Sequence, residues 1–210
     1  MGFVAQIDAK LAWHTQRAGL SIGLGAGALS GVFIAMRFWF GTAALALGVF
    51  AVHGAAAAVG EKAQAELKGS DGREIGSIKM IETTAGVLLR IKFKGLTPGP
   101  HGIHVHESGK CEGDFKSAGA IYNPLGAKHG YLNDEGPMVG DLPNIFVGAS
   151  GEVEVELVSP FVTLNREAEE TIFDADGTAF VVFEKADDYI SEGEGNAGAR
   201  IACGPISPVK

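Results

Sequence analysis

The chain has 210 residues, is 46% hydrophobic and carries a formal net charge of −8. This length suits one ordinary domain or slightly more, with ample apolar material for a core. Residues 1–58 hold three basic residues and one acidic residue, so residues 59–210 keep 14 basic and 24 acidic residues, a net charge of −10. A surface this acidic repels nucleic acid, which excludes the nucleic-acid-binding classes.

Residues 1–58 are predicted to be a leader that precedes a mature domain at 59–210. Residues 36–58 have the layout of a secretory signal: one basic residue, an apolar run, then small residues suited to cleavage near Ala58. Translation could instead start at Met36, which would shorten an unusually long leader. The rival interpretation is an uncleaved membrane anchor. Residues 18–36 and 38–58 are two uncharged apolar runs, and each approaches the roughly 20 residues of a transmembrane helix.

The leader predicts export, with the domain periplasmic or extracellular, or else anchored in the membrane and facing the periplasm. Both cysteines, Cys111 and Cys203, lie in the predicted mature domain. In an exported chain one such pair predicts a disulfide. In the chain-entropy model, closing a loop of about 90 residues stabilises the fold by roughly 4 to 5 kcal/mol. The alternative is a pair of free buried thiols.

From Lys62 onward, short runs of alternating apolar and polar residues are separated by glycine-rich turns. This pattern is typical of an antiparallel sandwich or barrel. Residues 107–146 show little periodicity, and a long loop in an ordered domain indicates a function or a covalent tie. The predicted strands are KAQAELKG, REIGSIKMIETT, VLLRIKFKG, IHVH, GEVEVELVSP, TIFDADGTAFVVFEK and ARIACGPI.

Three of the six histidines fall within the run HGIHVH, at His101, His104 and His106. Residues two apart on a strand point to the same face, so His104 and His106 form a clamp suited to a metal ion. His101 falls on the other face or in a turn, and we expect it to be structural. Two further donors, His129 and Asp141, lie in the long loop.

Five motifs follow one another along the mature chain: HGIHVHESGKCEG, SAGAIYNPLGAKHG, VGDLPNIFV, FEKADDYISEG and GNAGARIACGPI. Together they resemble the copper/zinc superoxide dismutase family of the bacterial, exported type, over nearly all of residues 62–207. The resemblance implies an all-β fold, an eight-stranded antiparallel Greek-key barrel with a long metal-site loop and one intrachain disulfide. It also implies copper and zinc as cofactors.

The copper ligands of the family carry over only in part. The family holds copper with four histidines, and the first two match His104 and His106. The third, which bridges the two metals, falls on Ile121, and the fourth falls on Phe183. With two nitrogens left, we expect copper to bind weakly if at all.

The zinc ligands are also incomplete. The family's zinc adds a histidine that matches His129, another that falls on Met138, and an aspartate that matches Asp141. Asp187 matches a carboxylate that, in the family, hydrogen-bonds one copper histidine and one zinc histidine, here His104 and His129. Structural zinc almost always takes four protein ligands, so zinc binding is doubtful as well.

Apolar residues thus stand at three of the six ligand positions: Ile121, Met138 and Phe183. We expect them to pack as a small core where the metals would sit, each contributing roughly 1.5 to 3 kcal/mol. Arg200 matches the arginine that guides superoxide to copper in the family. The alternative is an arginine that orders a loop by hydrogen bonds to backbone carbonyls.

The sequence therefore predicts an exported dismutase-like domain with impaired or absent dismutase activity. The first alternative is a working or residual superoxide dismutase, converting superoxide to oxygen and hydrogen peroxide with copper at His104 and His106. The second is a periplasmic copper-binding protein. We expect no nucleic-acid partner, membrane contact only through an uncleaved leader, and a monomer or homodimer, with an unknown protein partner left open.

Overall fold

The first three strands follow the alternation in the sequence. The computed structural model describes residues 59–209, so the predicted leader, its cleavage site and the internal start lie outside the described residues. β1 (Lys62–Gly69), β2 (Glu74–Thr83) and β3 (Gly86–Lys94) form an antiparallel meander. In β1 and β3 every second side chain is buried, as the side-chain period of a strand requires.

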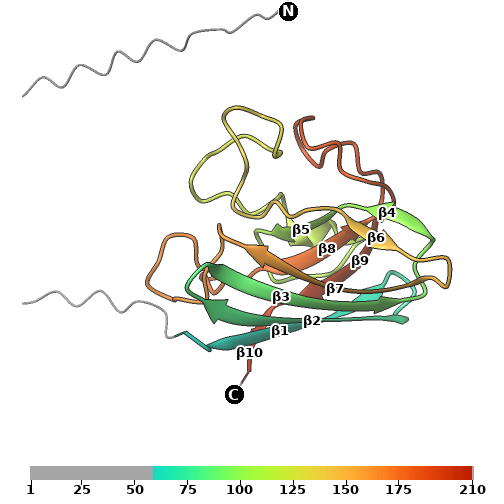
Figure 1. Ribbon diagram of the computed structural model, residues 1–210, viewed down its shortest axis with the longest axis horizontal. Helices are drawn as coiled ribbons and strands as arrows, with labels where there is room; N and C mark the ends of the chain where they lie inside the picture. Colours follow the sequence, from blue (N-terminus) through green and yellow to red (C-terminus); the bar gives the residue numbers. More distant parts are fainter. Residues whose placement is uncertain (1–58, 210) are drawn as a thin grey trace, which may run out of the picture. The chain divides into compact units, whose positions relative to one another are not determined.

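Most strands join one curled antiparallel sheet, in the order β5-β8-β9-β1-β2-β3-β7, with β10 paired to β1 (Figure 1). β3 pairs with β7 rather than with its successor, so the chain crosses over in the manner of a Greek key. This confirms the predicted all-β fold. The remaining bounds are β4 (Gly99–His101), β5 (Ile103–His106), β6 (Ile145–Val147), β7 (Glu152–Ser159), β8 (Ala179–Phe183), β9 (Arg200–Pro205) and β10 (Ser207–Pro208).

Two clusters of buried side chains share strand β8, which is buried on both faces. Phe180 and Val182 point into the main core of the barrel. Ala179, Val181 and Phe183 alternate with them and point to a smaller second core. The other buried members of the second core are Phe115, Ala118, Ala197 and Cys203. The apolar run AFVVF is thus a strand with one residue set for each core.

Two segments differ from the expectations. The run TIFDADGTAFVVFEK forms a strand only over Ala179–Phe183, because the turn residues before it, including Gly177 with φ 71°, direct the chain into a loop. The short strands β4 and β6, which pair with each other, were too brief to predict. Residues 59–209 contain one 3-10 turn, Lys116–Ala118, and no helix long and apolar enough to span a membrane.

Two loops rise on the same side of the sheet, residues 107–144 and residues 184–199 (Figure 1). They touch directly, since the Leu132 amide donates to the Tyr189 carbonyl at 2.9 Å. A disulfide between Cys111 and Cys203 ties the first loop to β9, with a Cα–Cα distance of 5.7 Å. The predicted disulfide is therefore confirmed, and both loops lie over the ends of β5 and β8.

Candidate metal centre

His104 and His106 lie side by side on β5, with ring centroids 6.3 Å apart. Their neighbours Ile103 and Val105 belong to the main core, so the two imidazoles face the opposite side of the strand. Both histidines are fully buried. The strand therefore produces the clamp that the spacing predicts.

Each of these two rings keeps one buried nitrogen free. Burial, and next the charge of Arg200, lower the pKa of His106 to about 3, so this ring is neutral. Nδ1 of His106 lies 3.0 Å from the Gly119 carbonyl and donates to it, which leaves a lone pair on Nε2. Nε2 of His104 donates to Asp187 at 2.9 Å. Within residues 59–209, neither His106 Nε2 nor His104 Nδ1 has a hydrogen-bond partner. A buried polar group left without a partner costs about 1 to 3 kcal/mol, and these two nitrogens are the atoms of the clamp that could still bind a metal ion.

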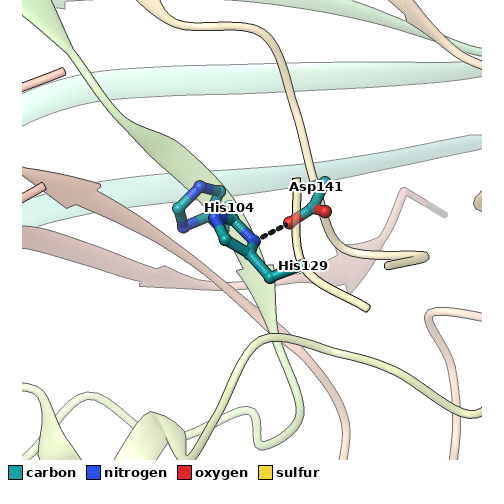
Figure 2. A group of neighbouring side chains, drawn as sticks. All are labelled: His104, His129 and Asp141. Atoms are coloured by element: carbon teal, nitrogen blue, oxygen red, sulfur yellow. Dashed lines mark hydrogen bonds and ion pairs between the residues drawn. The ribbon is translucent and has the colours of Figure 1, made fainter. Parts of the chain in front are cut away.

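A continuous chain of hydrogen bonds joins four buried side chains beside the clamp. Asp141 Oδ1 accepts from His129 Nδ1 at 2.7 Å, and Asp187 Oδ1 accepts from His129 Nε2 at 3.2 Å. The second oxygen of Asp187 accepts from His104. Figure 2 shows His129 bonded to Asp141, with the ring of His104 alongside. The structure thus brings together the loop residues His129 and Asp141, the strand residue His104, and Asp187.

The central imidazole of this chain carries a charge. Burial alone would lower the pKa of His129, but the hydrogen bonds to Asp141 and Asp187, and the charges of both carboxylates, raise it to about 10. Burial would likewise raise the pKa of Asp187, but hydrogen bonds from His104 and His129 hold it well below its usual range. His129 is therefore an imidazolium between two carboxylates, with both ring N–H groups donated.

The two residues that remain of the zinc half bond directly to each other. Two tetrahedral ligands at about 2.0 to 2.2 Å from zinc lie about 3.3 Å apart. His129 Nδ1 and Asp141 Oδ1 are 2.7 Å apart, which is the distance of a direct hydrogen bond. The second oxygen of Asp141 is occupied as well, accepting the backbone amides of Gly130 at 2.8 Å and Met138 at 2.9 Å. Zinc binding here would require His129 Nδ1 to lose its proton and to move apart from Asp141 Oδ1, whereas the amide bonds to Asp141 Oδ2 could remain.

One residue of the copper half and two residues of the zinc half also lie close enough together to share a metal ion. His104, His129 and Asp141 are fully buried and each brings one potential ligand atom within 4.8 Å of the others. However, both nitrogens of His129 and one nitrogen of His104 already donate to carboxylates. An ion bound by all three residues would therefore have to replace a proton of His129, as metal binding does at any histidine.

Phe183 occupies the copper side of the centre. Its ring is fully buried, 5.1 Å from the ring of His104 and stacked on His106 at 5.8 Å. Ile121, buried to 3% exposure, forms a β-bridge with His106. Met138 departs from the expected small core, because its side chain is partly exposed and belongs to neither buried cluster. Ile121 is buried but also belongs to neither cluster, so Phe183 alone is placed against the two imidazoles and the expected core of three residues is not formed.

The loop that carries Asp187 is fixed by the protein alone. Asn144 and Asp187 exchange two hydrogen bonds of 2.8 Å, and the Tyr189 amide donates to Asp187 Oδ1 at 2.6 Å. Gly195 lies with φ 60° so close that a Cβ would stand 1.8 Å from Asp187 Oδ1. Only glycine allows this approach.

Other residues singled out from the sequence have structural partners. The ring nitrogens of His101 lie within hydrogen-bond distance of backbone carbonyls, with Nδ1 2.7 Å from that of Phe183 and Nε2 2.8 Å from that of Thr97. Arg200 donates to backbone carbonyls of the 107–144 loop and to Glu194. Sequence reasoning missed Glu194, and the only signal was a carboxylate six residues before Arg200 in a glycine-rich loop.

Known proteins of one family resemble the chain over most of its length. The family described as copper/zinc superoxide dismutase (SODC) matches residues 74–206. Copper/zinc superoxide dismutase 2 of Aquifex aeolicus is 48% identical over 147 residues, covering 69% of this chain and 86% of that protein. The superoxide dismutase-like protein YojM of Bacillus subtilis is 41% identical over 144 residues, covering 67% of this chain and 74% of that protein.

Solved structures agree with these relatives. The crystal structure of a SOD-like protein from Bacillus subtilis has a TM-score of 0.66 at 41% identity, covering 68% of this chain and 96% of that chain. Crystal structures of variants of a SOD-like protein from the same organism, with one or two residues changed to histidine, give the same score.

Proposed function

Since this chain belongs to the copper/zinc superoxide dismutase family, we propose that it is an exported dismutase-like domain whose dismutase activity is impaired or absent. The observation that carries this proposal is the fully buried ring of Phe183 against His104 and His106. Dismutation by a protein-bound copper requires that the protein retain the ion at a fixed site. Two imidazole nitrogens hold a cupric ion weakly and without enforced geometry.

The zinc half supports the same proposal, because protein groups replace the ion in ordering the loop. Asp141 accepts three hydrogen bonds, and its own carbonyl accepts the Tyr131 hydroxyl at 3.0 Å. His129 joins this carboxylate to Asp187 across the two loops. A domain whose loops are joined by such hydrogen bonds suits a scaffold or an interaction module.

Export is the second part of the proposal. It rests on the signal-like layout of residues 36–58 and on the disulfide, which persists in oxidising compartments. Sequencing the N-terminus of the secreted protein tests it. A first residue near Val59 supports a cleaved leader, whereas recovery of the intact chain in the membrane fraction supports the anchor.

The activity is tested on the full chain, purified without added metal and then loaded with copper and zinc. Bound metal is measured by mass spectrometry and superoxide consumption by stopped flow. The control is the triple variant Ile121→His/Met138→His/Phe183→His, which returns nitrogen donors to all three apolar positions. We expect the natural chain to be slower than the loaded variant by at least about 100-fold, the upper range for disturbing even the partners of metal ligands. A natural chain as active as the Aquifex aeolicus relative would refute the proposal.

A copper-binding function is the second candidate, favoured by the free buried nitrogens of His104 and His106. The same experiment separates the two. Stoichiometric copper that survives dialysis, without superoxide consumption, would favour copper capture. Loss of that copper in the variant His106→Gln, which keeps a similar volume, would locate it at the clamp.

A further inference from the structure

An open hollow of about 690 Å³ lies between the two loops, and Ile121, at one of the lost copper-ligand positions, lines it. Ile121 and Gly119 line it from the 107–144 loop, and Glu192 and Glu194 line it from the 184–199 loop. Arg200, at the start of β9, is the only basic residue among the described residues that line it. Among these residues, Arg200 is therefore the one positively charged side chain that an anion entering the hollow would meet.

The guanidinium of Arg200 already has a partner for each of its nitrogens. Nη1 donates to the Phe115 carbonyl at 2.7 Å, and Nη2 donates to the Gly119 carbonyl at 2.6 Å. Nε donates to Glu194 Oε1 at 2.9 Å, and Nη2 contacts the same oxygen. The edge formed by Nε and Nη2 is the edge with which an arginine holds an oxyanion.

We propose that Glu194 is a built-in occupant of this anion site, so that Arg200 is closed to small anions and serves as a clamp between the two loops. The pair is well shielded, with 14% of the Arg200 side chain and 31% of the Glu194 side chain exposed. A carboxylate held on the same chain competes at a high effective concentration, so a dissolved anion in the millimolar range cannot displace it. This closure is separate from the loss of metal ligands.

The neighbouring carboxylate Glu192 provides a matched comparison. It lies two residues away and lines the same hollow, but it is exposed and pairs with Lys128 at 3.6 Å instead of with Arg200. Removal of Glu192 changes the net charge of the hollow by the same amount as removal of Glu194. Only removal of Glu194 vacates the Nε and Nη2 edge.

The test is phosphate binding by the full chain without metal, measured by calorimetry and by the NMR signal of the Arg200 Nε–H group. We expect Glu194→Ala to bind phosphate at least about tenfold more tightly than the natural chain, as expected for one recovered charge-assisted hydrogen bond. Glu192→Ala should bind like the natural chain, and Glu194→Ala/Arg200→Gln should lose the gain. Circular dichroism confirms that each variant folds.

Two results would overturn the proposal. An equal gain in Glu192→Ala and Glu194→Ala would show that net charge, and not a closed site, governs entry. No gain in a folded Glu194→Ala variant would show that the backbone carbonyls alone keep Arg200 from anions. Because the assay contains no metal, neither result depends on whether the loaded domain consumes superoxide.

Discussion

Truncation of Phe183 to alanine tests whether this ring, rather than a metal, stabilises the region around the two histidines. The side chain is fully buried and belongs to the second core. The other members of this core include three alanines, at 118, 179 and 197, and these side chains are too short to extend into the vacated space. We therefore expect most of the cavity left by Phe183→Ala to persist.

The expected loss of stability is large. Phenylalanine-to-alanine changes in cores cost about 3 to 5 kcal/mol, and the cost grows by about 24 cal/mol for each Å³ of cavity that persists. With small neighbours we expect the upper half of that range, about 4 to 5 kcal/mol. For a domain of this size, the melting temperature falls by about 2 to 4 °C per kcal/mol, hence by roughly 8 to 20 °C.

Urea denaturation followed by circular dichroism measures the change, with Phe146→Ala as the matched control. Phe146 is 72% exposed on β6, so its truncation should change the free energy of unfolding by no more than about 0.5 kcal/mol. Both variants should keep the slope of the transition, which reports the surface exposed on unfolding. A loss for Phe183→Ala no larger than that for Phe146→Ala would refute the assignment of Phe183 to a stabilising core.

Three further predictions concern the hydrogen-bonded chain and the disulfide. In metal-free protein the His129 ring should titrate near pH 10 by NMR, because its pKa is raised from about 6.5. The contribution of this charged ring to the free energy of unfolding should be complete below about pH 6.5 and should be lost as the pH rises through about 10. A His129 ring that titrates near pH 6.5 would contradict the imidazolium. Asp187→Asn should lower the free energy of unfolding by about 3 to 5 kcal/mol, because it breaks a buried charged pair. Asp188→Asn should cost clearly less, because that carboxylate is exposed and its hydrogen bonds are to groups of its own loop; equal losses would count against the buried chain. Replacing both Cys111 and Cys203 with alanine should cost about 2 to 5 kcal/mol in the same urea assay, and an unchanged midpoint would show that the disulfide does not stabilise the fold.

The strands could be predicted where the alternation was local and long. KAQAELKG coincides with β1, because alternate alanine and leucine side chains enter the core. The limits of β8 could not be predicted from its sequence. Its side chains enter two cores, so the apolar run shows no alternation, and the strand begins only after the turn at Gly177. The pairing of β3 with β7 joins segments some 60 residues apart, and its register follows from closure of the whole sheet.

The sequence predicted which residues form the candidate site, but it did not predict which of them hydrogen-bond to each other. Spacing on a strand placed His104 and His106 together, and the family resemblance placed His129, Asp141 and Asp187 near them. The direct bond between His129 and Asp141 was not foreseen, because it depends on the exact approach of two points in one loop. Pairing of Glu194 with Arg200 was hidden for the same reason.

The backbone at position 121 bears on how such a domain can change over evolutionary time. Ile121 is bridged to His106, and the next residue, Tyr122, exchanges backbone hydrogen bonds with Val105 and Gly140 and donates its hydroxyl to the Thr171 carbonyl at 2.7 Å. None of these bonds involves the side chain of Ile121. Donor atoms can therefore be gained or lost at this position by exchanging a side chain while the main chain stays in place. A histidine placed at position 121 would therefore stand on a main chain that is already held to β5 by its own hydrogen bonds.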